Sequence, residues 1–185
     1  MIFLPCTTSL VAYAIIFRSL FANDGLVNYV LVNLGILDKP YNFLTQPFAA
    51  KMVIILALLW RWTGYNMVFF LSGLQNIEYS VYEAAKIDGA SAIQTFFKIT
   101  VPLLKPTILL TAIMSTNGTL QLFDESINLT DGGPANASIS MSHYIYNLCF
   151  KYVPNFGYAA ALSFFILLLV AVLAFIQMRV GDKRD

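Results

Sequence analysis

Few side chains in this sequence could carry out enzyme or metal chemistry, and their spacing argues against most such sites. His143 is the only histidine, and Cys6 and Cys149 lie far apart without CxxC or CxxH spacing. A multi-histidine metal site therefore cannot be built from this chain. We expect both cysteines to be small buried thiols and His143 to be a satisfied or solvated loop residue.

The most informative spacing lies in residues 76–102, NIEYSVYEAAKIDGASAIQTFFKITVP. Asn76 is suited to cap a helix that begins at Ile77, and Glu78 would favour the positive end of that helix. Gly89 stands where a left-handed helix terminator belongs. The pattern predicts a folded first helix with a sharp end.

A second short helix is predicted to follow at once. Ser91 and Gln94 have the spacing of a capping box, and Pro102 would open the next long helix. An apolar side is expected from Ile93, Phe96 and Phe97. A compact helix–glycine–helix element could be a docking surface for a partner, or an amphipathic hairpin that rests on a bilayer. The pattern alone leaves both interpretations open.

The composition indicates that a membrane holds these elements. Of the 185 residues, 58% are hydrophobic and only 11% are charged, whereas soluble domains are about 45–50% apolar and about 25% charged. This leaves too little polar surface to cover a soluble particle. The net charge of +1 offers no basic excess for nucleic acid, so we expect no such partner.

We therefore predict an all-α, polytopic membrane helix bundle with about four transmembrane helices. The start of the chain lacks the basic leader and cleavage site of a signal peptide, so a membrane helix is the better interpretation there. The expected spans are residues 1–20, 48–74, 101–123 and 157–178, with a loop at 75–100 and a tail at 179–185.

The distribution of Lys and Arg predicts the orientation. Three lie in or beside the loop 75–100, three lie in the tail 179–185, and four lie in the remaining loops. Cytoplasmic segments carry the excess of such residues. We expect the loop 75–100 and the C-terminus to face the cytoplasm.

Several polar or aromatic side chains are predicted at membrane depth. Asn117 and Gln121 stand one helical turn apart and would share a face with Gly118, while Trp62 and Tyr65 lie in another span. Amides beside aromatic rings suit a sugar, yet polar residues in spans also serve helix–helix hydrogen bonding. Both interpretations stay open. Arg61, also within a span, is either a functional charge or an ion-paired, snorkelling one.

A family resemblance bears on the loop. Glu83-Ala84-Ala85-x-x-x-Gly89, followed after nine residues by Ile99-x-Val101-Pro102, resembles the EAA loop of binding-protein-dependent ABC importer permeases. The longer string YEAAKIDGAS is similar to the carbohydrate branch of that family, which includes maltose, lactose, arabinose and glycerol-3-phosphate permeases. The lactose type looks most similar. The resemblance extends through LFANDGLVNYVLVNLGI, LQLFDESINLTDGGP and FGYAAALS, and so covers nearly the whole chain.

The sequence departs from the family pattern in three respects. Val101 replaces the usual Leu, and Glu78 stands where relatives commonly have Pro. Such permeases also usually have about two further spans and a cytoplasmic leader before the position of Met1 here. The resemblance thus implies a type I ABC importer permease fold whose N-terminal spans are missing.

The resemblance implies a role as a bacterial inner-membrane permease that is not an enzyme. Its partners would be a cytoplasmic ABC ATPase dimer, a sister permease, an extracytoplasmic binding protein and a sugar. The sequence has no G-x-x-x-x-G-K-[ST] phosphate loop, so ATP would be bound by the ATPase and no cofactor is expected here. The coupling residues carried over from the family are Glu83, Ala84, Ala85, Asp88, Gly89 and Ala90.

Two other functions compete with this one. A permease of the same family could carry another solute, such as glycerol-3-phosphate or an amino acid. A stand-alone secondary carrier usually has acidic residues at membrane depth, whereas Asp124 and Glu125 are expected only at the outer end of a span. The carrier is therefore the weaker alternative.

Overall fold

The computed structural model describes residues 7–181, and every regular element in this range is a helix. The predicted all-α class is confirmed. In chain order the elements are α2 (Leu10–Leu20), α3 (Leu26–Asn33), α4 (Pro47–Gln75), α5 (Tyr79–Ile87), α6 (Ala92–Thr95), the π-helix η1 (Phe96–Thr100), α7 (Val101–Leu103), α8 (Lys105–Leu120), α9 (Asp124–Thr130), α10 (Met141–Tyr146), the π-helix η2 (Asn147–Lys151) and α11 (Phe156–Gly181).

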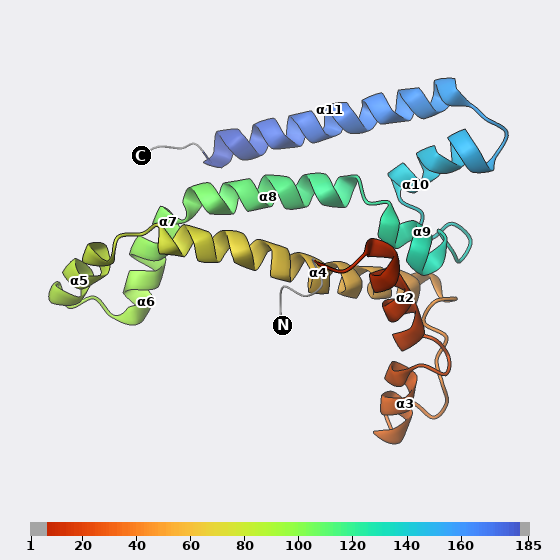
Figure 1. Ribbon diagram of the computed structural model, residues 1–185, viewed down its shortest axis with the longest axis horizontal. Coiled ribbons are helices and arrows are strands. Elements are labelled where there is room, and N and C mark those ends of the chain that lie inside the picture. Colours follow the sequence, from red (N-terminus) through yellow and green to blue (C-terminus); the bar gives the residue numbers. More distant parts are fainter. Residues whose placement is uncertain (1–6, 182–185) are drawn as a thin grey trace.

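Three long helices form the body of the molecule. Figure 1 shows α4, α8 and α11 running along one common direction. At one end of this body lie α5 and α6, and at the other end lie α2, α3, α9 and α10. The loop predicted at 75–100 thus lies at the end of the body opposite α2, α3, α9 and α10.

Helices α4 and α11 are long and apolar enough to cross a membrane, with 29 and 26 residues. A proline opens α4 in its first turn, where the missing N–H has no intrahelical partner to lose. The bounds of both helices agree with the expected spans 48–74 and 157–178 to within three residues. In the most apolar stretch of each helix, only 22% of α4 and 6% of α11 is buried within the protein. Such exposed apolar surfaces suit helices that face lipid.

The third expected span, 101–123, has a different form. The helical segment Ala92–Leu103 and α8 meet at an angle of 65°, and the break falls at Leu104. Pro106 lacks the N–H that would bond the carbonyl four residues earlier, so the helix restarts at Lys105. Pro102 therefore continues the preceding segment and does not open the span, and the helix ends at Leu120.

The first expected span, 1–20, is only partly described. Within the described residues it is the 11-residue helix α2, about 16 Å long and shorter than the roughly 30 Å hydrocarbon core. The described chain therefore holds two helices that can span, or three if the bent pair is one span, where about four were predicted. Residues 1–6, with Cys6, and residues 182–185 of the tail lie outside the described residues.

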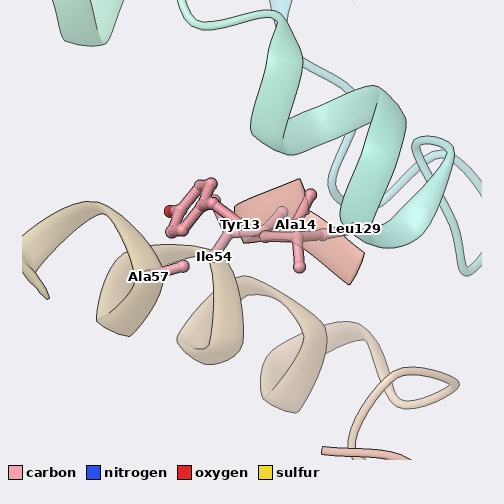
Figure 2. Close-up of a cluster of buried hydrophobic side chains, with 5 residues drawn as sticks. All are labelled: Tyr13, Ala14, Ile54, Ala57 and Leu129. Atoms are coloured by element: carbon pink, nitrogen blue, oxygen red, sulfur yellow. The ribbon is translucent and has the colours of Figure 1, made fainter. Parts of the chain in front are cut away.

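A small apolar core joins three helices at the end of the bundle opposite α5 and α6. Tyr13 and Ala14 of α2 lie between Ile54 and Ala57 of α4 and Leu129 of α9, as Figure 2 shows. Two of these five side chains are alanines, which allow helices to approach closely where lipid supplies no hydrophobic drive. This core holds α2 and α9 against the first half of α4.

Candidate functional site

The end of helix α5 has the geometry predicted for the loop. Gly89 has φ +74°, and a Cβ atom there would meet nothing within 4 Å. Its N–H donates to the Lys86 carbonyl at 3.2 Å, and the Ala90 N–H donates to the Ala85 carbonyl at 3.0 Å. This pair of bonds is a Schellman motif. Gly89 is required for its left-handed backbone and not for space.

The second short helix begins as predicted. Ser91 Oγ accepts a hydrogen bond from the Gln94 N–H at 3.3 Å, and Gln94 Oε1 accepts one from the Ser91 N–H at 2.9 Å. The reciprocal pair is a complete capping box. The turn between α5 and α6 is therefore fixed by local bonds on both sides of Gly89.

The start of α5 differs from the prediction. The helix begins at Tyr79, not at Ile77, and Glu78 occupies the N-cap without a side-chain cap bond. Asn76 ends α4 instead of opening α5. Because α4 continues through Gln75, the two residues after it are used for the turn between the helices.

The element from α5 to α7 presents an exposed surface at the end of the bundle. Glu83, Ala84, Asp88 and Gly89 are exposed, whereas Ala85 is buried and Ala90 is half-buried. Ile87 next to them is 86% exposed. Large exposed apolar side chains also include Tyr79, Ile93, Phe96 and Phe97. An apolar patch of this kind marks a protein or membrane contact.

Two features tie this surface to the membrane helices. The Tyr82 hydroxyl lies 3.3 Å from Thr100 Oγ1, which links α5 to η1. The segment α6–η1–α7 then leads directly into the bend at Leu104 and into α8. Leu104 is therefore the one residue between this element and α8.

Asn117 of α8 and Gln121, the residue directly after α8, lie together. Gln121 Nε2 donates to Asn117 Oδ1 at 2.8 Å. The two amides line an open cavity of about 600 Å³ between α8, α10 and α11. Ser142 and Ser163 also line it, among aliphatic side chains. The cavity combines hydrogen-bonding groups with apolar walls.

Gly118 faces a different neighbour from Asn117 and Gln121. A Cβ atom at Gly118 would lie 2.6 Å from Trp62 Cζ2, so its lack of a side chain admits the indole of α4. Trp62 in turn contacts Tyr65 edge to face, with ring centroids 5.5 Å apart. The predicted path residues are thus divided between two faces of α8 and do not form one cluster.

Arg61 forms an ion pair with Glu125. Its Nη1 donates to Glu125 Oε1 at 2.8 Å, with the arginine side chain 30% exposed and the glutamate 3% exposed. The ion-paired interpretation of Arg61 is confirmed. Sequence reasoning did not identify Glu125 as the partner, although an arginine within a span requires a counter-charge.

His143 is buried in the short helix α10, so the prediction of a solvated loop residue is wrong. Its Nδ1 lies 2.9 Å from Ser126 Oγ. Ser126 has one hydroxyl hydrogen, which it donates to the Ser138 carbonyl, so Nδ1 donates to Oγ. His143 Nε2 lies 3.8 Å from Asp131 Oδ1, which accepts from Lys151 Nζ at 3.0 Å. Burial lowers the pKa of His143, Lys151 lowers it further, and Asp131 opposes both.

A comparison with models of protein families identifies the family of this chain. Residues 1–184 match the model described as the binding-protein-dependent transport system inner membrane component. The chain belongs to this family. It is similar to the lactose transport system permease protein LacF of Rhizobium radiobacter, with 56% identity over all of this chain and 62% of the length of LacF. The arabinooligosaccharides permease protein AraP of Bacillus subtilis (strain 168) is 34% identical over 98% of this chain and 58% of its own length.

Solved transporters have the same fold as this inner membrane component. A bacterial ABC transporter involved in import of the acidic polysaccharide alginate matches all of this chain and 64% of its own, with a TM-score of 0.85 and 25% identity. A second structure is the bacterial alginate transporter in complex with a periplasmic protein that binds an alginate pentasaccharide. It matches with a TM-score of 0.77 and 26% sequence identity, over 98% of this chain and 61% of the matched chain. The chain spans about three fifths of its relatives' length.

Proposed function

We propose that this chain is the permease subunit of an ABC importer and forms part of the translocation path for a carbohydrate. The observation that carries the proposal is the family match over residues 1–184. The solute class rests on the names of the relatives, which transport lactose, arabinooligosaccharides and alginate. All three are saccharides, which favours a sugar over an amino acid.

The α5–α6 turn is the proposed contact with a cytoplasmic ATPase dimer. Glu83 supplies a charge, the exposed Ala84 allows close approach, and Gly89 fixes the turn in its left-handed conformation. Asp88 and Ala90, which flank Gly89, complete the contact. Ala85 is buried and would act by packing, with its carbonyl accepting the Ala90 N–H that closes the turn. The excess of Lys and Arg near this end supports its cytoplasmic orientation, together with that of the C-terminus.

The geometry supports a simple route for coupling. Closure of the ATPase dimer on ATP would move the α5–α6 turn, and the bend at Leu104 would pass that motion to α8. A paired sister permease would move likewise, so that the path alternates between inward-facing and outward-facing states. A sugar released by an extracytoplasmic binding protein would enter in the outward-facing state.

Two faces of α8 are candidates for the sugar path. One carries the Asn117 and Gln121 amides beside the cavity, and the other carries Gly118 against Trp62 and Tyr65. Asn117→Ala with Gln121→Ala tests the first face, and Trp62→Leu with Tyr65→Leu tests the second. The double substitution on the face that lines the path should raise the KM for uptake and leave assembly of the transporter intact. If neither pair alters KM or rate, the sugar passes elsewhere.

Co-purification with the ATPase tests the assignment as a whole. The tagged full-length permease is expressed with the ATPase and sister permease of its transport system and extracted in detergent. We expect the ATPase to co-purify with the native protein and to be lost with Glu83→Lys combined with Gly89→Val. Retention of the ATPase by the variant would show that the α5–α6 turn is not the contact.

The cargo is tested in the assembled complex. ATP hydrolysis is measured with the binding protein and with lactose, an arabinooligosaccharide, glycerol-3-phosphate or an amino acid. Stimulation by a saccharide alone supports the proposal, and stimulation by one of the other two identifies a different solute class. Uptake that persists without the ATPase would instead establish a secondary carrier.

A further inference from the structure

Helix α3 has an inverted pattern of burial. Its most buried side chain is the polar Asn28, which is 1% exposed. The Asn28 amide donates to the carbonyls of Ala22 and Tyr41 at 2.9 Å, and its Oδ1 accepts from the Tyr41 N–H at 2.8 Å. The protein therefore satisfies the polar side of this helix internally.

The outward face of α3 is apolar. Its helical spacing brings together Leu26, Tyr29 and Val30, and Leu34 extends the face by one turn. All four are exposed, with Tyr29 and Leu34 each at 68%. Asn33 is the one polar residue on this face, and no charged residue lies within the helix. In water such a face would be unfavourable, so an apolar partner must cover it.

The position of α3 indicates what that partner is. Figure 1 shows α3 projecting sideways from the bundle, across the direction of α4, α8 and α11, at the end opposite α5. Helix α4 has 29 residues and is about 43 Å long, so it extends beyond a hydrocarbon core of about 30 Å. Helix α3 lies beside the N-terminal end of α4. If α4 extends into the headgroup region at that end, α3 lies at the same depth, beside the bundle.

We propose that α3 is an interfacial helix whose apolar face, Leu26, Tyr29, Val30 and Leu34, inserts into the bilayer at the end opposite the α5–α6 turn. Tyrosine is enriched at this depth because its ring is apolar and its hydroxyl is polar. Asn23 and Asp24, in the turn before the helix, are exposed and would face the headgroups and water. The Asn28 bonds fix the helix so that its apolar face points outward.

The size of the face favours lipid over a protein partner. Eight helical residues extend only about 12 Å, whereas a stable protein interface buries about 800 Å² on each side. A lipid surface needs no such complementary area, and the affinity rises with the apolar area inserted. The inference requires only that α4 crosses the membrane, so it does not depend on the cargo or on the ATPase contact.

Fluorescence quenching by lipids tests the inference. The full-length permease, purified with its partners, has its native cysteines replaced by serine and carries a single environment-sensitive probe at Leu26→Cys or Val30→Cys. Asn23→Cys is the matched control, because it is exposed, polar and only three residues before Leu26. The complexes are reconstituted in phosphatidylethanolamine and phosphatidylglycerol vesicles with a nitroxide placed near the headgroup or near the acyl-chain end.

We expect the nitroxide near the headgroup to quench the probes at positions 26 and 30 at least about twofold more than the probe at 23, because interfacial helices insert about 5–10 Å. The deep nitroxide should quench less. Quenching by aqueous iodide instead of lipid would show that the face is in water and would overturn the inference. A probe shielded from both quenchers would show a protein cover, such as the sister permease, and would overturn it equally. ATPase co-purification with each labelled variant confirms that the complex is assembled.

Discussion

Arg61 of the long apolar helix α4 and Glu125 of the short helix α9 form an ion pair at 2.8 Å that joins the two helices. The glutamate is almost fully buried, so it depends on the arginine for solvation. The same region contains the core of α2, α4 and α9. The pair therefore fixes where α9, and the turn that follows it, lie relative to the membrane helices.

Glu125→Gln should destabilise the protein, because the uncharged amide leaves Arg61 without a counter-charge. Removing one partner of a fully buried pair costs about 3–5 kcal/mol, and we expect about half of that because Arg61 is partly exposed. The measurement is thermal unfolding of the detergent-solubilised complex. Arg61→Met with Glu125→Leu should regain much of the loss, since an apolar pair carries no uncompensated charge. If the double variant were as unstable as Glu125→Gln, the pair would not be the cause.

This pair also shows what the sequence could not predict. Features set by adjacent residues, such as the left-handed Gly89, the Ser91–Gln94 capping box and the lengths of α4 and α11, followed from local pattern and were confirmed. Arg61 and Glu125 are 64 positions apart, and no local pattern links them.

The bend at Leu104 was not predicted: Pro102 was expected to open a straight span, whereas the helix breaks between Pro102 and Pro106. The division of α8 into two faces depended on tertiary packing in the same way. Asn117 and Gly118 are adjacent in sequence, yet they meet α10 and α11 on one side and Trp62 on the other. Successive residues of a helix point about 100° apart. Which of these directions faces a cavity and which faces a side chain depends on how the neighbouring helices pack.

Gly89→Val should abolish uptake while the protein still inserts into the membrane. A side chain at φ +74° strains the backbone by about 1–3 kcal/mol, and a branched one would shift the α5–α6 turn away from the ATPase. Transport into proteoliposomes and ATPase co-purification should both be lost.

Gly35→Val is the matched control for that strain. Gly35 has φ +68°, meets nothing within 4 Å at a Cβ position, and ends α3 with the same Schellman bonds. It carries the same backbone cost at the opposite end of the bundle. We expect it to lower stability slightly and to retain the ATPase. Equal loss of ATPase co-purification in both variants would show that the substitutions act on folding and not on coupling.

The buried His143 predicts a loss of stability in acid. Because burial lowers its pKa in the folded protein, the unfolded chain takes up a proton first as the pH falls below about 6.5. Stability from the neutral ring is therefore present above that pH and declines below it, toward the lower folded pKa. Unfolding midpoints should fall by a few degrees between neutral pH and the acid side of this window.

His143→Asn isolates this effect, because its amide can still donate to Ser126 Oγ but does not titrate. We expect the variant to be less stable than the native protein at neutral pH and to lose the part of the pH dependence that begins near 6.5. Carboxylates still titrate at lower pH in both proteins. An unchanged pH profile in His143→Asn would assign the acid sensitivity to other groups.

Gly118→Ala tests how closely α4 and α8 must approach. The added methyl group would lie 2.6 Å from Trp62 Cζ2, and the edge-to-face contact with Tyr65 restricts the indole from moving aside. Overpacking of this kind costs about 1–3 kcal/mol, measured as a lower unfolding midpoint. Gly157→Ala is the control, since a Cβ atom there meets only Asn155 Oδ1 at 4.0 Å and should be tolerated. Trp62→Phe should rescue Gly118→Ala, because a smaller ring leaves room for the methyl group. Additive losses in the double variant would mean that the glycine is required for some reason other than the indole.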